Sequence, residues 1–328
     1  MWFKLFIPYI VLINMTDLLF KYAGHLELHP LYFTMQAMVF GSLALLVLAR
    51  PGPLALETIR SVGTWVYAVL FLAGNVALFY TLQYVDIITA GFLKTSSILF
   101  SLVLAAVFLG RYSMNKKKAV GIAGIITGLV VLIAQMPPHL TGPALAICLG
   151  AGLITTLSAF TQELHEASNK TKGIISHELR VTGFTIGITA LVFLVVILLG
   201  AMLKTQFGVP VPGVFTPSPA QMVSRESMLL ALVYGVFLLS SIRFLLFYWI
   251  KRIKTETYLV LAAMLPFGAI VADLVGDWLG LVPMVGLTPL QLAAGGLIVA
   301  SALLVQYSGA AHRREKRRAK FRRKQDPI

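Results

Sequence analysis

The sequence predicts an all-α polytopic membrane protein with ten transmembrane helices, arranged as two inverted five-helix repeats. Of the 328 residues, 58% are hydrophobic and only 12% are charged, which is far from the composition of a soluble domain. Apolar runs of about 18 or more residues, long enough to cross a bilayer, recur along the whole chain. Basic residues alternate between successive connections, and the two halves of the chain resemble each other weakly.

Ten apolar segments have the hydropathy and length of a membrane-spanning helix. Turn residues such as Pro137-Pro138 and the loop 207–219 separate them. The first segment is expected to be a retained helix and not a signal peptide, because no small-residue cleavage site follows it. The expected spans lie near 3–23, 31–49, 63–84, 87–109, 117–135, 142–163, 177–203, 227–249, 256–280 and 288–308.

Lysine and arginine are concentrated in alternate connections, which sets the expected orientation. The connections after spans two, four, six and eight each carry at least two of them. Those after spans three, five and nine carry none, and the longer one after span seven has only Lys204 and Arg225. Because cytoplasmic loops are enriched in these residues, we expect both termini in the cytoplasm, which requires an even number of spans.

Two repeats are expected, residues 1–135 and 136–309, followed by a basic cytoplasmic tail at 310–328. Aligning Gly121 with Gly295 pairs Thr127 with Ser301. Five spans per repeat is an odd number, so the second copy is inverted relative to the first. Inverted repeats of this kind enclose a substrate site near the bilayer midplane, where one half moves against the other.

The formal net charge of +14 suggests either nucleic acid or a membrane surface as a partner. Nine of the 27 lysines and arginines lie between Arg313 and Lys324. Because this tail follows a membrane span, we expect it to attract anionic lipid headgroups and no nucleic acid. We also expect no cofactor: Cys148 is the single cysteine, and no phosphate-binding G-x-x-x-x-G-K-[ST] motif marks an ATP-driven pump.

Lys94 is the leading functional candidate, because it lies well inside the fourth span. It belongs to a row of small residues that includes Ala90, Ser97, Ser101 and Ala105, which would share one face of a continuous helix. A charge inside a membrane needs a partner, water or a ligand. We therefore list Lys94 and Ser97 as substrate-binding residues, with an ion pair between Lys94 and Asp17 as the structural alternative.

Arg243 in span eight is a second candidate for binding an anion, since a guanidinium can hold a phosphate through two hydrogen bonds. The alternative is an arginine that extends toward the cytoplasmic surface near Lys251. Asp17 in span one either lines the cavity and balances charge, or pairs with Lys21 four residues later.

Asp273 and Asp277 in span nine offer two interpretations. Asp273 is expected to carry a coupling proton or to balance the charge of a basic site residue. The alternative is the Mg²⁺–diphosphate site of an intramembrane prenyltransferase, which needs more aspartates than this pair. Gln36, Asn75 and Tyr80 are further candidates for lining the cavity, whereas hydroxyl rows such as Thr182, Thr185 and Thr189 more often bond helix to helix.

Family resemblance rests on the stretch 75–131 and on its second copy from Leu287 onward. The first contains F-Y-T-L-Q-Y-V-D-I-I-T-A-G, then F-L-G-R and a glycine-rich span; the second reads L-T-P-L-Q-L-A-A-G-G-L-I-V-A-S-A-L-L. The chain resembles the drug/metabolite transporter superfamily, with its EamA-like ten-helix fold, over nearly its full length. Ser97 stands where the bacterial exporter branch usually has a proline, although Pro266 keeps the equivalent proline in span nine.

Lys94-Thr95-Ser96-Ser97 looks more like the nucleotide-sugar and triose-phosphate translocator branch. In that branch a basic residue at this place is associated with the anionic part of the substrate. Ala262-Ala263 lies where the triose-phosphate translocators carry Lys-Arg, which disfavours a triose phosphate here.

These observations predict a secondary transporter, not an enzyme, that moves a small polar anion such as a nucleotide sugar by alternating access. An amino-acid or drug exporter of the EamA type is the alternative, and a prenyltransferase or lipid-interacting scaffold is the alternative of another class. The plasma (inner) membrane is the favoured location and a Golgi membrane is the alternative. A homodimer is compatible with the sequence.

Overall fold

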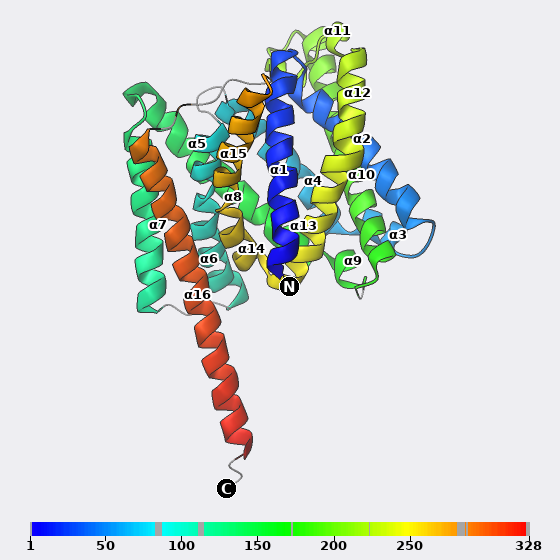
Figure 1. Cartoon of the computed structure of the whole chain (residues 1–328). Coiled ribbons are helices and arrows are strands. Elements are labelled where there is room, and N and C mark those ends of the chain that lie inside the picture. Colours follow the sequence, from blue (N-terminus) through cyan, green and yellow to red (C-terminus); the bar gives the residue numbers. More distant parts are fainter. Residues whose placement is uncertain are drawn as a thin grey trace.

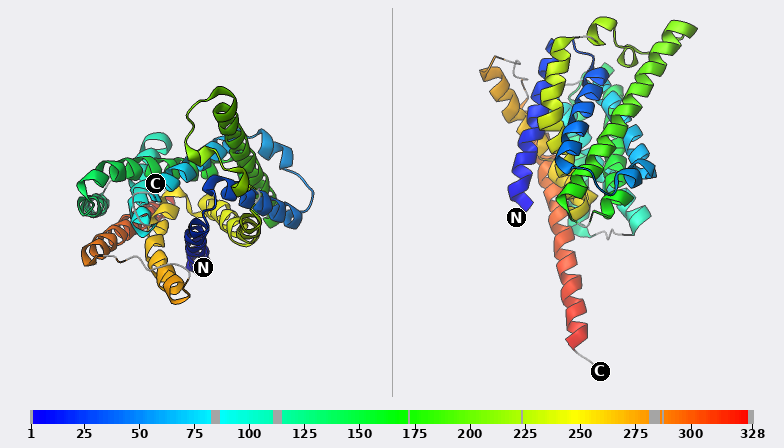
Figure 2. Two further views of the ribbon diagram at one scale, coloured as in Figure 1. Left: turned by 90° about the horizontal axis from the view of Figure 1, so that it is seen from above. Right: turned by 90° about the vertical axis from the view of Figure 1, so that its right-hand side faces the viewer.

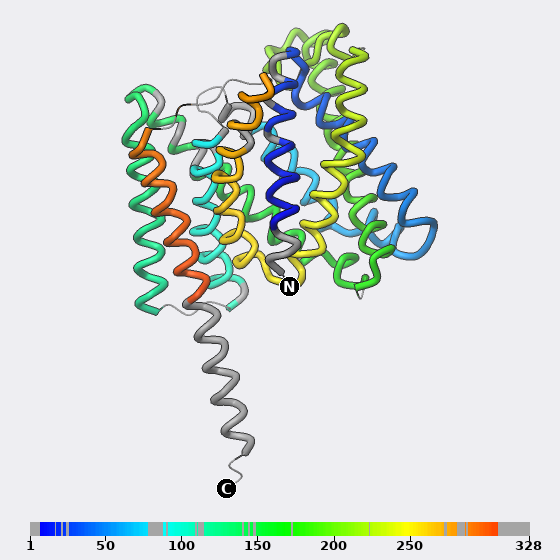
Figure 3. Tube along the Cα trace, viewed as in Figure 1, coloured from blue at the N-terminus to red at the C-terminus, as the bar shows by residue number. Residues whose placement is uncertain are grey.

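The computed structural model describes residues 2–82, 87–110, 115–171, 173–222, 224–280, 286 and 288–325. Every regular element in these ranges is a helix, so the predicted all-α class is confirmed (Figure 1). Figure 3 follows the chain trace through the bundle. The side chains of three candidate residues, Asp17, Tyr80 and Asp273, lie outside the part of the structure that is described.

The helices follow one another with short connections. In chain order they are α1 (Trp2–His25), α2 (Pro30–Ala49), α3 (Ala55–Arg60), α4 (Val62–Leu82), α5 (Ile87–Lys94), α6 (Ser96–Leu109), α7 (Lys116–Ala134), α8 (Pro138–Leu164), α9 (Glu166–Asn169), α10 (Ile175–Phe207), η1 (Gly213–Phe215), α11 (Pro219–Met222), α12 (Arg225–Val233), η2 (Tyr234–Leu239), α13 (Ser240–Ile253), α14 (Thr255–Ala262), α15 (Leu265–Trp278) and α16 (Pro289–Gln325).

Within the described residues, seven helical segments are long and apolar enough to cross a membrane, and Ile7–Phe20 and Val62–Ala77 are two shorter apolar segments. Large hydrophobic side chains such as Val47 and Phe108 project from the bundle, as expected for helices surrounded by lipid. The chain is therefore a multi-pass integral membrane protein. The count of ten spans stays a prediction. The seven segments are Pro30–Ala49, Gly91–Phe108, Lys116–Ala134, Ile175–Phe207, Arg225–Ile253, Thr255–Trp278 and Pro289–Tyr307.

The fourth and ninth predicted spans are both interrupted helices. Thr95 alone separates α5 from α6, and its hydroxyl donates to the Phe92 carbonyl at 2.5 Å, which competes with the helical hydrogen bonds. Ala263 and Met264 separate α14 from α15, where Pro266 has no N–H to continue the ladder. Each interrupted span consists of an 8-residue helix followed by a 14-residue helix.

The two interrupted spans pack against each other close to their breaks. A Cβ added to Gly91 would lie 3.1 Å from Cγ of Pro266, so the absence of a side chain at Gly91 lets the two spans approach closely there. Phe92 and Phe267 meet edge to face with their ring centres 5.6 Å apart. The fourth and ninth predicted spans therefore contact each other close to the breaks in their helices.

α7 and α16 lie side by side along a seam of glycines (Figures 1 and 2). A Cβ on Gly121 would lie 2.8 Å from the Ser301 carbonyl oxygen, and one on Gly128 would lie 2.5 Å from Cγ1 of Ile298. Small residues at this spacing let two helix backbones approach closely inside a membrane. These helices are the fifth and tenth predicted spans.

The short helices α3 and α9 lie at one end of the bundle, as Figure 1 shows. We refer to this as the terminal end. The lysine- and arginine-bearing connections after α2, α9 and α13 share it.

Candidate functional site

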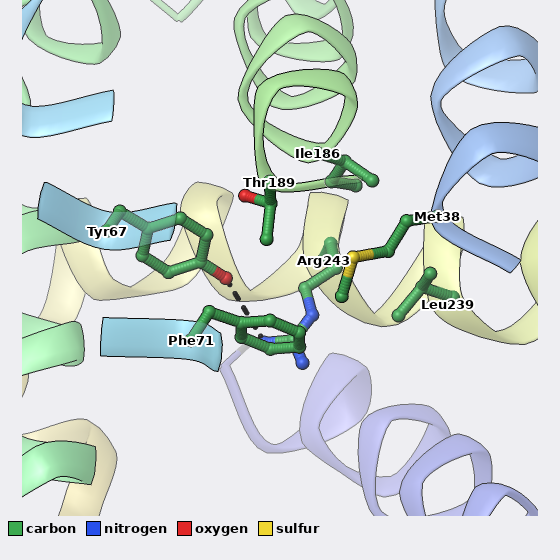
Figure 4. A pocket seen from close by; sticks show the side chains of 7 residues that line it. All are labelled: Met38, Tyr67, Phe71, Ile186, Thr189, Leu239 and Arg243. Atoms are coloured by element: carbon green, nitrogen blue, oxygen red, sulfur yellow. Dashed lines mark hydrogen bonds between the residues drawn. The ribbon is translucent and has the colours of Figure 1, made fainter. Parts of the chain in front are cut away.

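A small pocket lies among helices from both halves of the chain (Figure 4). Its volume is about 10 Å³, which is room for about one water molecule and too little for an organic substrate. The described residues that line it are Met38 from α2, Tyr67 and Phe71 from α4, Ile186 and Thr189 from α10, Leu239 from η2, and Arg243 from α13.

Arg243 is the charged residue of this pocket. Its Nη1 donates to the Tyr67 hydroxyl at 3.3 Å, and its guanidinium carbon lies 4.1 Å from the centre of the Phe71 ring (Figure 4). The residue is half-buried, and among the residues that the structure describes no carboxylate forms an ion pair with it. Its positive charge is therefore offset by a phenol and an aromatic face, both weaker partners than a carboxylate.

Arg243 lies deep in its span. Ile253 ends α13 ten residues later, which corresponds to roughly 15 Å at 1.5 Å per residue, or about half of the ~30 Å hydrocarbon core. The span changes to π-helical geometry in η2 just before α13, where a Cβ on Gly235 would lie 2.2 Å from the Ala37 carbonyl oxygen. Such π segments are frequent at functional sites. Anion binding and the surface-seeking alternative for Arg243 both remain predictions.

Aromatic residues surround the arginine. Tyr67 meets Phe247 edge to face at 5.5 Å. Farther into the bundle the hydroxyls of Tyr9 on α1 and Tyr258 on α14 lie 2.5 Å apart, and both residues are buried. Aromatic side chains from α1, α4, α13 and α14 thus pack in this part of the bundle.

Lys94 and Ser97 lie away from this pocket. Lys94 is the half-buried last residue of α5, directly before the break, and it is not among the described lining residues. Ser97 is buried in the first turn of α6, where its carbonyl accepts a hydrogen bond from the Thr156 hydroxyl of α8 at 2.9 Å. A one-residue break at Thr95 lies within the expected row. The binding roles of both residues remain predictions.

Gln36 and Asn75 bond to other helix groups. The Gln36 side chain accepts a hydrogen bond from the Ser227 hydroxyl at 2.9 Å, and the Asn75 amide donates to the Phe71 carbonyl of its own helix at 2.8 Å. Of the predicted binding residues with described side chains, the structure therefore brings Arg243 to the pocket. Thr189, predicted to bond helix to helix, donates its hydroxyl proton to the Thr185 carbonyl of its own helix and also lines the pocket.

A buried carboxylate at the terminal end forms ion pairs with two basic side chains. Oε1 of Glu178, at the start of α10, lies 3.6 Å from Nζ of Lys251 and 3.5 Å from Nη1 of Arg252. Lys251 also donates to the Thr171 hydroxyl and to the Ser168 carbonyl. These contacts tie α10 and the loop after α9 to the end of α13.

Glu163, at the end of α8, binds the start of α14. Its Oε2 accepts hydrogen bonds from the Thr255 backbone N–H at 2.9 Å and from the Thr255 hydroxyl at 2.8 Å, while Oε1 lies 3.3 Å from Nζ of Lys254. A carboxylate is favourable here because the first N–H groups of a helix lack partners. The buried Glu163 thus binds the first turn of α14, which begins the interrupted ninth span.

Arg180 connects the two halves of the chain. This buried side chain donates four hydrogen bonds of 2.8–3.1 Å to the carbonyls of Ala49, Arg50 and Pro53, and so completes the carboxyl end of α2. A Cβ on Gly52 would lie 2.6 Å from its Nη2. The glycine therefore leaves the space that the guanidinium fills.

His165, between α8 and α9, makes a second connection between the halves. Its Nδ1 accepts from the Ser168 N–H at 3.2 Å, and its Nε2 lies 2.9 Å from the Thr64 hydroxyl, which itself donates to the Thr58 carbonyl. Nε2 must then carry the proton of a neutral ring. Burial lowers the pKa of His165 to about 4. On the exposed surface, Lys170 and Glu57 add an ion pair of 2.7 Å between the same segments.

Among the described residues, no three or more histidine, cysteine, aspartate or glutamate side chains form a cluster that could hold a metal ion. The side chain of Asp273, half of the predicted aspartate pair, lies outside the described residues.

Comparisons with known proteins show a family similarity over part of the chain. Residues 7–134 match the EamA-like transporter family. No curated protein matches the chain. Thirteen solved chains match, among them one described as “Crystal structure of protein”, with 16% identity, a TM-score of 0.58 and coverage of 93% of this chain and 97% of its own length. At this identity the likeness shows the fold alone. Over residues 7–134 the chain is thus similar to the EamA-like family, a family of transporters and not of enzymes, as the sequence predicted.

Proposed function

We propose that the protein is a secondary active transporter that moves a small organic anion by alternating access, with Arg243 as the anion-binding residue. One observation carries this proposal: a half-buried arginine lies inside a membrane span, in a pocket shared by both halves, without an ion-paired carboxylate among the described residues. An arginine at a helix centre costs at least about 2.5–3.5 kcal/mol in membrane insertion. A substrate anion would offset that cost.

The geometry of the site suits an anion. A guanidinium presents five N–H donors in a planar fork, which matches a carboxylate or phosphate. The structure engages one donor with the Tyr67 hydroxyl and one face with Phe71. An entering anion would replace or share the contacts of the guanidinium with Tyr67 and Phe71. No hydrogen-bond acceptor would lose its partner, because the Tyr67 hydroxyl can donate to the anion.

Two structural features support the proposed inverted repeat of residues 1–135 and 136–309. The interrupted spans α5–α6 and α14–α15 have the same 8- and 14-residue lengths. Interrupted helices in corresponding positions of two halves are typical of transporters with inverted repeats. α7 and α16 pack together, as expected when equivalent helices meet near a symmetry axis.

The terminal end would act as the closed gate in this conformation. Arg180, His165 and Lys170 of the second half all bind residues of the connection around α3 in the first half. We propose that these three contacts break when the pocket opens toward this end. The basic connections gathered there support a cytoplasmic location for both termini of a ten-span protein.

Other predicted roles complete the proposal. Lys94 would attract the anion from its place at the α5–α6 break, and Asp17 or Asp273 would carry a coupling proton or balance charge. Exchange for a second anion is the other coupling mode. The basic tail would attract anionic lipid headgroups of the plasma membrane or, in the nucleotide-sugar case, of a Golgi membrane.

Uptake by proteoliposomes tests the proposal. Purified protein should accumulate a labelled organic anion from a panel of carboxylates, phosphates and nucleotide sugars without added metal. The Arg243→Gln variant should lose uptake, and Arg225→Gln, the same exchange at an exposed position at the start of α12, should keep it.

Three outcomes would contradict the proposal. Mg²⁺-dependent turnover of a prenyl diphosphate without uptake would favour the enzyme alternative. Uptake of cations alone, lost in Asp273→Asn, would favour an exporter of cationic substrates. Anion uptake that survives Arg243→Gln but is lost in Lys94→Ala would move the site to the α5–α6 break.

A further inference from the structure

The residues around Arg243 are mostly apolar, and this composition bears on the kind of anion that the proposed transporter accepts. Among the described lining residues, Arg243 carries the only charge, and Tyr67 and Thr189 supply the only hydroxyls. Carbon-rich side chains form the remaining wall, namely Met38, Phe71, Ile186 and Leu239. In Figure 4 they lie around the guanidinium.

From this lining we infer that the substrate is a monovalent anion with an apolar body, such as a hydrophobic monocarboxylate, and not a nucleotide sugar. The inference rests on the proposed function and narrows it to one class of substrate. Charge balance is its first support. One guanidinium neutralises one negative charge, whereas a diphosphate would leave at least one charge uncompensated in a largely dehydrated site.

Three other described cations at the terminal end, Arg180, Lys251 and Arg252, are already engaged. Glu178 binds Lys251 and Arg252, and Arg180 is surrounded by carbonyl oxygens. Recruiting any of them to a diphosphate would leave a buried carboxylate or a helix end without its partner. The site therefore binds an anion with one negative charge at a lower free-energy cost than an anion with two.

The hydrogen-bonding groups of the pocket also match a carboxylate. The Tyr67 hydroxyl accepts from Arg243, so its own proton is free to be donated. The Thr189 hydroxyl uses its proton on the Thr185 carbonyl of its own helix. The pocket thus presents the remaining guanidinium donors and a phenol donor to a group that only accepts, which is the behaviour of a carboxylate. A sugar hydroxyl needs an acceptor as well as a donor.

The apolar wall supplies the remaining recognition. Met38 and Leu239 flank the arginine on one side and Ile186 on another, so the part of the ligand beyond its carboxylate would contact hydrocarbon. The pocket now has room for about one water, at about 10 Å³, and must widen before a ligand enters. Methionine is well suited to this, because its unbranched side chain adopts many shapes at little cost.

Ligand-dependent thermal stabilisation of the purified full-length protein tests this inference. The probes are benzoate, its neutral isostere benzamide, the cation benzylamine, acetate, the dianion phthalate and UDP-glucose. Benzoate should bind at least tenfold more tightly than each of the other five. Arg243→Gln should remove the preference of benzoate over benzamide, whereas Arg225→Gln should keep it.

Each contrary result has a distinct meaning. If UDP-glucose or phthalate binds more tightly than benzoate, the inferred substrate class is wrong, while Arg243-dependent anion uptake would still support the transporter proposal. If acetate matches benzoate, the apolar body is not recognised and the inference fails. If benzylamine or benzamide binds best in the parent protein and Arg243→Gln changes nothing, both the inference and the anion-transport proposal fail.

Discussion

Acid should destabilise the protein through His165, and the size of the effect follows from the structure. The ring is buried and neutral between Thr64 and the Ser168 N–H. Burial lowers its pKa from 6.5 to about 4. Below pH ~6.5 the unfolded chain takes up a proton that the folded protein resists, so stability falls as the pH drops from about 6.5 to 4.

The difference of about 2.5 pKa units corresponds to roughly 3 kcal/mol at 1.36 kcal/mol per unit. At pH 5 the free energy of unfolding should already be about 2 kcal/mol lower because of His165, whereas at pH 8 His165 should not lower it. His165→Asn keeps a side chain that can cap α9 but does not titrate. The melting temperature of the parent in detergent should therefore fall more steeply between pH 8 and pH 5 than that of His165→Asn.

The exposed His139 provides the matched control, since His139→Asn makes the same exchange near the other end of α8. Its melting curve should follow that of the parent at every pH. Parallel pH profiles for the parent and His165→Asn would refute the reasoning, because they would show that the buried ring takes up its proton as easily as in the unfolded chain.

Three further substitutions test the contacts that hold the bundle together, each by melting temperature in detergent. Arg180→Lys should lower the free energy of unfolding by about 3 kcal/mol, because an ammonium group cannot replace all the hydrogen bonds of the guanidinium. About two charged hydrogen bonds are lost, at roughly 1.5 kcal/mol each. An unchanged melting temperature would show that Arg180 does not stabilise the end of α2. Gly235→Ala should cost about 1–3 kcal/mol by crowding the α2 backbone, whereas Gly150→Ala, with nothing within 4 Å, should be neutral. Glu163→Gln should lower the free energy of unfolding by about 1–2 kcal/mol, because a neutral amide caps the start of α14 less well than a carboxylate. Glu166→Gln makes the same exchange at an exposed position, and an equal effect there would contradict the capping role of Glu163.

Membrane-spanning segments could be predicted closely from the sequence, because hydropathy and turn residues act locally. The expected spans 31–49 and 117–135 correspond to Pro30–Ala49 and Lys116–Ala134. The breaks were harder to predict. Pro266 is a strong local signal, but the hydroxyl bond of Thr95 to Phe92 is only one of several conformations open to a threonine.

The contacts of the charged residues within the spans could not be predicted from the sequence. Lys94 and Arg243 both read as charges within apolar spans, and only the fold shows that Arg243 faces Tyr67 and Phe71, which precede it by more than 170 residues. Its aromatic partners gave no signal of their own, because tyrosine and phenylalanine are common along membrane helices.

The network at the terminal end could not be predicted for a similar reason. Arg180 and Glu178 read as residues of a basic cytoplasmic connection, the ordinary place for charge in a membrane protein. Their buried roles depend on partners 73 to 131 residues away, such as the Ala49 carbonyl and Lys251. Sequence periodicity carries information about neighbours on one helix and not about such contacts.

The central claim, that the anion binds beside Arg243, is tested most directly by whether a bound anion protects the pocket wall. Thr189 lines the pocket, and Thr189→Cys in a Cys148→Ser background leaves one thiol in the whole chain. Alkylation of that thiol should be slowed by saturating benzoate, and the protection should disappear when Arg243→Gln is added. Unchanged alkylation at a benzoate concentration that saturates binding would contradict the account, because the anion would then bind elsewhere.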